Sequence, residues 1–341
     1  MFIDFSTTLN QWRNNSPRVN ELSSKFLSIA IGDSGVPSST PLEEKHATRF
    51  FENDKPTLEF YERCKKNFGK FGRHFISSIP YALQEWCRLG TALNLYLSKI
   101  RLNLGRDTYF QSIGSAEGVI ARTVSEYGHY TLTNSSTPAN REEFYKNGSF
   151  ERASFFSGPY FDISPDLFRA ADELKHFSDG FDVIFEDTCF QMHAPNRAEQ
   201  VAWVCQNLRE NGLFICWEKC LASDQQEYQR RENFKDSEFK SRYFSEQQVM
   251  YKKNSILQSM EHGQVTLDTL VKGISASLQH IAVIWNSGNF YTLIASNDPR
   301  KIEDFCQCLL APCIPPEYQH LDLPKIMSDS HMELFFRQSK A

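Results

Sequence analysis

The segment Tyr109–Arg122, with the sequence YFQSIGSAEGVIAR, joins a short apolar run to a turn of small residues. Gly114 permits a tight turn, and Ala116 and Gly118 leave room for a ligand to approach the backbone. The helix that follows such a turn begins with free N–H groups that point at the ligand. We therefore predict a nucleotide-sized cleft at this turn. The alternative is a corner that is tightened for packing alone.

Three residues with acid–base chemistry follow the apolar run Phe181–Phe185. Glu186 and Asp187 come directly after the run, and His193 lies in the segment that follows. The carboxyl end of a parallel strand is where ligands bind in open α/β sheets. Carboxylates and imidazoles there can remove a proton from a substrate, so these three are our candidate catalytic residues. The alternatives are a packed structural histidine and a solvated pair of loop carboxylates.

Several common chemistries lack their motifs. Cys306 and Cys308 with Cys313, and Cys216 with Cys220, do not have the two-residue separation of a zinc knuckle, so we predict no metal site. The sequence holds no serine nucleophile elbow, no P-loop and no HExxH. Nine cysteines, an odd number, are typical of reduced thiols in a cytoplasmic protein.

Charge is unevenly distributed along the 341 residues, whose net charge is −5. Nine Lys or Arg and two Glu fall between Glu62 and Arg106, so this stretch carries +7 and the rest carries −12. Such a stretch can meet phosphate or carboxylate partners, or it can be a solvated helix face. Glu218 and Lys219 are predicted to form a surface ion pair.

Alternating apolar strands and helices must position these residues. The predicted strands are Asp107–Ile113, His129–Thr133, Ala153–Phe156, Phe181–Phe185, Leu213–Trp217, His280–Trp285 and Phe290–Ala295. The predicted helices between them are Ser115–Tyr127, Pro165–His176 and Arg197–Glu210, the last one capped by Asn211-Gly212. This alternation predicts an α/β fold with a doubly wound, mostly parallel, seven-stranded sheet. The four residues before Phe290 are too few for a parallel crossover, so the last two strands form an antiparallel C-terminal hairpin.

The chain divides into three parts by this pattern. Residues 1–105 form a helical N-terminal region, and residues 106–310 form the α/β domain, which carries a polar helical insert at about 223–261. Residues 311–341 form a C-terminal tail, in which 325–338 is predicted as a docked helix. The sequence has no run of about 18 apolar residues, so we predict no membrane span. The first residues lack the pattern of a signal peptide, so we expect a cytoplasmic location.

The order of these segments resembles the class I (Rossmann-like) S-adenosylmethionine (SAM)-dependent methyltransferases that act on small molecules. The family motif is an acidic residue followed by three alternating glycines, and this chain has SIGSAEG at 112–118. The segment 181–187 (FDVIFED) is similar to the family's fourth-strand region, and 206–215 (QNLRENGLFI) to its helix, turn and fifth strand. The closing hairpin looks like the family's reversed seventh strand. The resemblance covers about residues 106–298.

The resemblance implies SAM as the cofactor. The positions that match the family's cofactor contacts are Ser112, Gly114, Ser115, Ala116, Glu117, Gly118, Asn134, Tyr160, Phe161 and Glu186. Family members usually have carboxylates where this chain has Ser112, Asn134 and Pro159, and each replacement removes a charge-assisted hydrogen bond. Glu117 or Glu186 could supply a carboxylate instead. Asn134 can still accept from a ribose hydroxyl, and Tyr160 or Phe161 could stack on adenine.

The activity that the resemblance implies is methyl transfer from SAM to O or N of a small or medium-sized metabolite. The N-terminal region and the insert would form a lid, with Phe244, Met250 and Tyr251 as candidate lid residues. The candidates for contact with an anionic substrate are Tyr228, Arg230, Arg231 and Lys235, and the alternative for them is a solvated charged helix.

Two other functions stay open at this point. One is a noncatalytic binding module in which the cofactor contacts have decayed. The other is a nucleic-acid methyltransferase that uses the basic stretch 62–106. It is not favoured, because no interleaved single-strand-binding motif accompanies that stretch. The helical N-terminal region could also join two copies as a homodimer.

Overall fold

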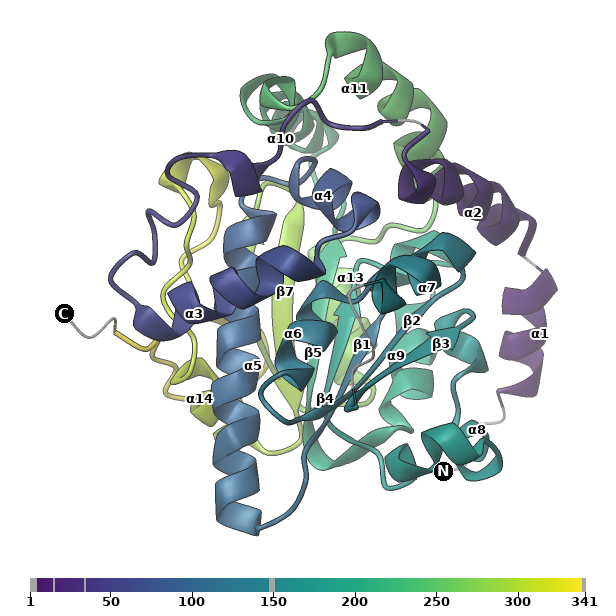
Figure 1. Cartoon of the computed structure of the whole chain (residues 1–341), viewed down its shortest axis with the longest axis vertical. Coiled ribbons are helices and arrows are strands. Elements are labelled where there is room, and N and C mark those ends of the chain that lie inside the picture. Colours follow the sequence, from purple (N-terminus) through teal and green to yellow (C-terminus); the bar gives the residue numbers. More distant parts are fainter. Residues whose placement is uncertain (1–4, 15, 34, 147–150, 339–341) are drawn as a thin grey trace.

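An eight-stranded sheet forms the centre of the protein (Figure 1). The computed structural model describes residues 5–14, 16–33, 35–146 and 151–338. In spatial order the strands are β3 (Ala153–Ser157), β2 (Tyr130–Ser135), β1 (Tyr109–Ile113), β4 (Phe181–Asp187), β5 (Leu208–Lys219), β7 (Phe290–Ser296), β6 (His280–Ser287) and β8 (Lys325–Ile326). The first five pair in parallel, whereas β7 is antiparallel to β5 and β6, and β8 is antiparallel to β6. The chain changes direction across the sheet between β1 and β4, and ligands bind at such switch points.

The predicted sheet is confirmed in its main features. It is doubly wound and mostly parallel, and it ends in an antiparallel C-terminal hairpin. The predicted number of seven strands is one too low, because the two-residue β8 is too short to show an alternating pattern. The predicted docked helix at 325–338 is wrong. That segment holds β8 and then extended chain up to Arg337, which forms a bridge with Leu310.

Helices cover both faces of the sheet and one of its ends (Figure 1). One face packs against α5 (Ala82–Leu104), α6 (Val119–Ser125) and α14 (Pro299–Cys306), and α3 (Lys55–Cys64) packs on α5 and α6. The other face packs against α8 (Pro165–Ala170), α9 (Arg197–Cys205) and α13 (Leu267–Ser275). The end is covered by α2 (Ser16–Ile31), α4 (Lys70–Ile76), α10 (Gln225–Glu238), α11 (Glu246–Lys252) and α12 (Gln258–Glu261). A π-helical turn at Lys253–Leu257 joins α11 to α12. Near β2 and β3 lie α1 (Ser6–Asn14) and α7 (Pro138–Tyr145).

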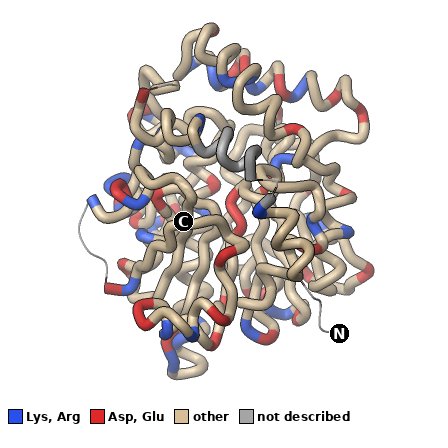
Figure 2. The backbone as a smooth tube through the Cα atoms, turned by 90° about the vertical axis from the view of Figure 1, so that its right-hand side faces the viewer, with Lys and Arg blue, Asp and Glu red and all other residues tan. Residues whose placement is uncertain are grey.

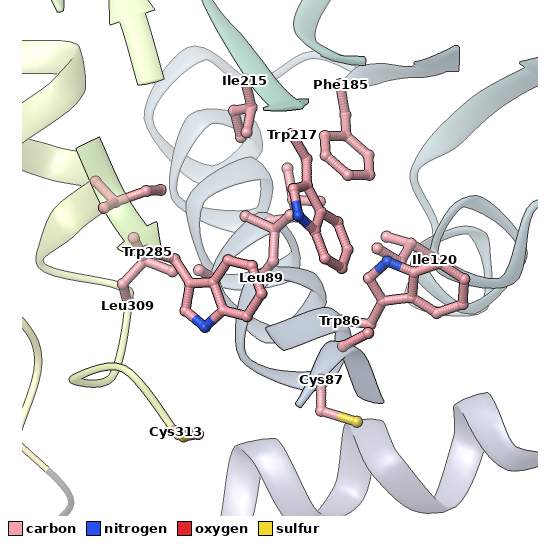
Figure 3. Close-up of a cluster of buried hydrophobic side chains, with 14 of the residues drawn as sticks. Trp86, Cys87, Leu89, Ile120, Phe185, Ile215, Trp217, Trp285, Leu309 and Cys313 are labelled. Carbon is pink, nitrogen blue, oxygen red and sulfur yellow. The ribbon is translucent and has the colours of Figure 1, made fainter. Parts of the chain in front are cut away.

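The core lies on both sides of the sheet, because successive strand residues point to opposite faces. In β5, Trp217 belongs to the cluster beneath α5, and its neighbour Cys216 belongs to the cluster on the other face. Figure 3 shows the first cluster, in which Trp217 meets Trp285 of β6 and Trp86 and Leu89 of α5. The rings of Trp217 and Trp285 pack edge to face, with their centroids 5.3 Å apart. This packing fixes α5 against the middle of the sheet.

The predicted helix Arg197–Glu210 ends earlier than expected. α9 stops at Cys205 and β5 begins at Leu208, so the Asn211-Gly212 pair lies inside the strand and is not a helix cap. The pairing of β4 with β5 shifts register near this pair, and Asn211 has a φ of 57°. The pair therefore marks a bulge in β5. In the sequence, an Asn-Gly pair at a bulge looks the same as one that ends a helix.

Two other predicted helices are also shorter in the structure. The helix predicted at 165–176 ends at Ala170 and is followed by a 3₁₀ segment, Asp172–Phe177, because Ala171 adopts an extended conformation. The helix predicted at 115–127 begins only at Val119, since Gly118 has a left-handed φ of 66°. The residues between β1 and α6 are thus left free to form a loop.

A buried ion pair connects α5 to the sheet. Arg88 and Glu85 lie one turn apart, and both side chains are fully buried, with the Arg88 Nε atom 2.7 Å from Glu85 Oε2. The guanidinium also donates to the carbonyl oxygens of Ile284 and Leu310, at 2.9 and 2.7 Å. Burial raises the pKa of Glu85, while Arg88 acts in the opposite direction. The arginine therefore compensates a buried carboxyl group and binds the backbone of β6.

We expect the substitution Arg88→Met to lower the free energy of unfolding by about 3–5 kcal/mol, because it leaves the Glu85 carboxylate buried without a positive charge beside it. Urea unfolding followed by circular dichroism measures this loss. The double variant E85Q/R88M should recover part of it. The control is Arg63→Met, which removes an exposed ion pair with Glu59 and should cost less than about 1 kcal/mol. Equal stabilities of R88M and R63M would contradict the assignment.

Candidate functional site

The turn after β1 has the conformation that its small residues permit. Gly114, Ala116 and Gly118 have φ values of 71°, 46° and 66°. A Cβ atom on Gly114 would lie 2.5 Å from Cys189 Cβ, and one on Gly118 would lie 2.7 Å from Thr133 Cγ2. Both glycines are therefore required by the backbone conformation and by close packing against neighbouring segments.

Two cavities open at this turn, and both contact Gly114 and Ala116. The central cavity, about 890 Å³, lies at the ends of β1, β4 and β5, and its lining includes Phe75, Ile79, Trp86, Asp187, Thr188 and Lys219. The β2-side cavity, about 590 Å³, has a lining that includes Asn134, Thr137, Asn140, Pro159, Tyr160 and His193.

Three apolar side chains form a wall that the two cavities share. They are Phe26 of α2, Phe71 of α4 and Met192, which ends a 3₁₀ turn at Phe190–Met192. The rings of Phe26 and Phe71 meet edge to face, with centroids 5.7 Å apart. Helices of the N-terminal region therefore close the end of the sheet where the ligand is expected.

The Glu117 carboxylate holds α4 in place. Its Oε1 atom accepts hydrogen bonds from the backbone N–H groups of Gly69 and Gly72, at 2.8 and 2.7 Å. Burial raises the pKa of Glu117, and these backbone hydrogen bonds oppose the shift. Glu117 belongs to the lining of neither cavity. The structure therefore places it at the beginning of a helix and away from the predicted cofactor contacts.

Glu186 has a similar position beside the turn after β4. Its Oε1 atom accepts from the backbone N–H groups of Cys189 and Phe190, and its Oε2 atom accepts from the thiol of Cys216 at 3.2 Å. Burial and the nearby Glu218 raise the pKa of Glu186 well above its ordinary value. It lines neither cavity. Its hydrogen bonds therefore hold the turn after β4 in place.

Asp187 is the candidate carboxylate that lines the central cavity. Its Oδ1 atom is buried and has no hydrogen-bond partner within the described chain. Burial raises the pKa of Asp187 to about 7, a hydrogen bond from Ser115 works against this rise, and Glu117 adds to it. The hydroxyl of Ser115 also bonds that of the fully buried Ser112. Asp187 is therefore poised to exchange a proton near neutral pH.

Asn134 and Tyr160 line the β2-side cavity, whereas Phe161 does not. The Asn134 amide accepts from the Gly114 N–H at 3.3 Å and donates to the Gly158 carbonyl at 3.0 Å, which ties the ends of β1, β2 and β3 together. The Tyr160 hydroxyl is buried with no hydrogen-bond partner among the described residues. Phe161 packs against the rings of other residues. Of the two predicted aromatic contacts, the structure brings Tyr160 to the cavity.

His193 is a buried imidazole at the bottom of the β2-side cavity wall. Its ring contacts Tyr160 and Phe161 edge to face, at centroid distances of 5.1 and 5.3 Å. Burial, and then the charge of Arg197, lower the pKa of His193 to about 4. His193 and Asp187 line different cavities. The three predicted catalytic residues are therefore not brought to one point.

Apart from Lys240, which forms an ion pair with Asp236, six residues of the two linings carry a buried polar atom without a hydrogen-bond partner in the described part of the chain. They are Trp86, Asn140, Tyr160, Asp187, Gln191 and His193. Buried polar groups are normally paired, so these atoms are available to hydrogen-bond with water or with a polar ligand in the cavities. Trp86, Asn140 and Gln191 were not predicted as site residues. Their sequence positions carry no turn, motif or charge signal that could have revealed them.

Glu218 and Lys219 do not form the predicted surface ion pair. Both are buried, and successive residues of β5 point to opposite faces. Glu218 pairs with Arg197 at 2.9 Å, whereas Lys219 pairs with Glu232 of α10 at 2.8 Å. Lys219 lines the central cavity. The prediction is wrong because it assumed that neighbours in sequence are neighbours in space.

The basic stretch 62–106 is accompanied by carboxylates and carbonyl groups in the structure. All nine basic residues of this stretch have polar partners, and they are Arg63, Lys65, Lys66, Lys70, Arg73, Arg88, Lys99, Arg101 and Arg106. Figure 2 shows basic and acidic residues interspersed along the backbone. No described helix has the length and apolar character needed to cross a bilayer.

Comparisons with known proteins find similar folds at low identity. The plantazolicin methyltransferase BpumL, in complex with a monoazolic desmethylPZN analog and SAH, is 11% identical, and the match covers 83% of this chain and 99% of that one, with a TM-score of 0.42. NodS, an N-methyltransferase from Bradyrhizobium japonicum WM9 in complex with SAH, is 11% identical over 69% and 96% of the two chains, with a TM-score of 0.41. The plantazolicin methyltransferase BamL is 11% identical over 74% and 99%, with a TM-score of 0.44. No family model and no curated relative matches the sequence. At these identities the similarity concerns the fold alone.

We expect Asp187→Asn to change how stability depends on pH. The folded-state pKa of about 7 lies above the ordinary 3.8, so stability falls as the pH rises between these two values. From pH 5 to pH 8 the wild-type protein should lose on the order of 3 kcal/mol more than D187N, which has no carboxylate to ionise. Urea unfolding at both pH values measures the difference. Parallel pH profiles for the two proteins would show that Asp187 ionises normally.

Proposed function

We propose that this protein is a SAM-dependent methyltransferase that acts on O or N of a small or medium-sized molecule. The observation that carries the proposal is the glycine turn at the switch point of the sheet. It lines two adjoining cavities whose walls carry polar atoms without hydrogen-bond partners among the described residues. A cofactor with a nucleoside at one end and an amino acid at the other would extend from one cavity into the other. The turn at Gly114 and Ala116 is where the two halves would meet.

The residues of the β2-side cavity fit the adenosine part of SAM. Asn134 and Asn140 offer amide groups for ribose hydroxyls, and Tyr160 offers an aromatic ring with an unpartnered hydroxyl. These amide and hydroxyl groups are neutral, and they can hydrogen-bond to the uncharged adenosine part of the cofactor. In this proposal His193 packs against Tyr160 and supports it, since burial keeps the imidazole uncharged.

The central cavity fits the charged end of SAM and the methyl acceptor. SAM supplies a methyl group that is already electrophilic, so the protein has only to align the acceptor and remove a proton where the acceptor carries one. Asp187 is the residue that we assign to this end. Its carboxylate can attract the positive charge of the cofactor or accept a proton, because its pKa of about 7 allows both states at neutral pH.

The helices over the cavities would act as the lid in this proposal. Phe26 of α2 and Phe71 of α4 belong to the linings of both cavities, and the insert contributes Ile256 and Met260 to the central cavity. A closed lid excludes water from the acceptor and the methyl group. A binding module without catalysis is the second candidate function. It is favoured by the absence of carboxylates at Ser112, Asn134 and Pro159.

We expect calorimetric titration to show binding of S-adenosylhomocysteine (SAH), and the substitution Tyr160→Phe to weaken it by about three- to tenfold. The substitution removes only the hydroxyl, whose hydrogen bond to the cofactor would be lost. The matched control is Tyr61→Phe, which alters a tyrosine of the other core cluster and should leave the affinity unchanged.

Formation of SAH from SAM, measured in the presence of acceptors, then separates the enzyme from the binding module. Binding without turnover for every acceptor would favour the module. No SAH binding at millimolar concentration would reject the enzyme and favour the module, because decayed cofactor contacts predict that result.

A further inference from the structure

Four lysines from four different elements line the central cavity. They are Lys219 of β5, Lys235 of α10, Lys252 of α11 and Lys240, which begins a 3₁₀ turn at Lys240–Arg242. The side chains of Lys219, Lys235 and Lys240 are only 3%, 6% and 2% exposed. Burying ammonium groups is costly unless negative charge compensates them.

Two carboxylates compensate Lys219, Lys235 and Lys240. Glu232 Oε2 lies 2.8 Å from Lys219 Nζ and 2.6 Å from Lys235 Nζ. Asp236 Oδ1 lies 2.8 Å from Lys240 Nζ. Burial would raise the pKa of Glu232, but the two ammonium groups outweigh it and hold the pKa below its ordinary value. Both carboxylates are thus ionised and already engaged.

Lys252 is bound by neutral groups. Its ammonium donates to His74 Nε2 at 2.6 Å and to Ser78 Oγ at 2.7 Å. His74 Nδ1 lies 2.6 Å from the Gly35 carbonyl, so the proton of the neutral ring sits on Nδ1 and Nε2 is the acceptor. In the described chain no ion pair joins Lys252 to a carboxylate.

The electrostatic surroundings of Lys252 are short of negative charge. Burial lowers its pKa well below the ordinary value, and the charges of Lys240 and Lys235 lower it further, whereas Asp236 acts in the opposite direction. Lys219 of β5 also repels it, and His74 of α4 contributes no positive charge because burial lowers its pKa well below the ordinary value. Three paired lysines and Lys252, whose charged form is disfavoured in the absence of a further anion, therefore share two carboxylates around one cavity. A structural network of this kind would normally be balanced.

The rest of the central cavity is apolar. Phe75, Ile79, Trp86, Phe290, Ile256 and Leu257 belong to its lining. A ligand that matches these walls has an apolar body and carries its charge at one end. The lysines supply long-range attraction and hydrogen-bond donors for that end.

We propose that the central cavity binds a methyl acceptor with an apolar body and one anionic group, a carboxylate or a phosphate, which the four lysines hold. This inference rests on the proposed function and names its substrate class. Lys240, Lys252 and His74 also line an adjoining outer cavity of about 660 Å³, together with Phe244 and Tyr251 of the insert. The anionic group therefore binds where the central and outer cavities meet. Lys235 belongs to the predicted set of anion contacts, while Arg230 and Arg231 pair with Glu227.

The test compares probes of one chain length that differ only at the polar end. Octanoate, octyl phosphate, octanamide and octylamine are titrated by calorimetry into the protein saturated with SAH. We expect octanoate or octyl phosphate to bind about tenfold or more tightly than octanamide, with octylamine weakest. The stronger of the two anions identifies the group as carboxylate or phosphate. Equal affinity for the anions and octanamide, or no binding of any probe, would overturn the proposal.

The variant Lys252→Met removes the ammonium without leaving a carboxylate unpaired. It should lower the affinity for the preferred anion by about tenfold, with little effect on octanamide. Lys253→Met, which changes the adjacent residue outside the cavity lining, is the matched control and should behave like the wild type.

The SAH titration separates this inference from the proposed function. If SAH fails to bind, the proposed function fails. If SAH binds normally but the anion shows no preference, only the acceptor class is wrong. If K252M weakens SAH and spares the anion, the lysines serve the cofactor and the inference is overturned.

Discussion

The hydrogen bonds from Gly69 and Gly72 to the Glu117 carboxylate are the interaction on which the site depends. Glu117 lies in the turn after β1, whereas the two glycines belong to the beginning of α4 in the N-terminal region. A carboxylate at a helix N-terminus is stabilised by the helix dipole and the free N–H groups. Because α4 carries Phe71 and His74, this contact fixes a wall of both cavities. It also fixes the imidazole that accepts a hydrogen bond from Lys252. The α/β domain thus acquires a closed site only with its N-terminal helices.

Most of the sheet could be predicted from the sequence, because buried parallel strands appear in it as short apolar runs between helices. The hairpin was equally clear, because the loop before Phe290 is too short for a crossover. Local sequence patterns could not predict the features that depend on how neighbouring strands pair. The Asn211-Gly212 pair looks like a helix cap but forms a bulge, because β5 must regain register with β4. Two residues of β8 form a strand only because the edge of β6 is available to them.

The site was predicted less completely, and the reason is geometric. Glu186 and Asp187 are adjacent, so they point to opposite sides of β4, and the sequence gives no sign of which one meets the cavity. The structure turns Glu186 into the loop and gives Asp187 to the cavity. The lysines come together from a strand, two helices and a 3₁₀ turn. Only Lys235 was among the predicted anion contacts, because a polar helix of this composition reads equally well as a solvated surface.

The π-helical turn at Lys253–Leu257 has an evolutionary consequence. A turn of this kind holds one residue more than an α-helical turn. Loss of one residue here can be absorbed by a change from π-helical to α-helical hydrogen bonding, so that α11 and α12 keep the faces they turn towards the cavity. Only the side chains of the turn itself would change, and Ile256 and Leu257 among them line the central cavity. Differences in length at this point are therefore expected to reshape one part of the cavity wall without disturbing the sheet.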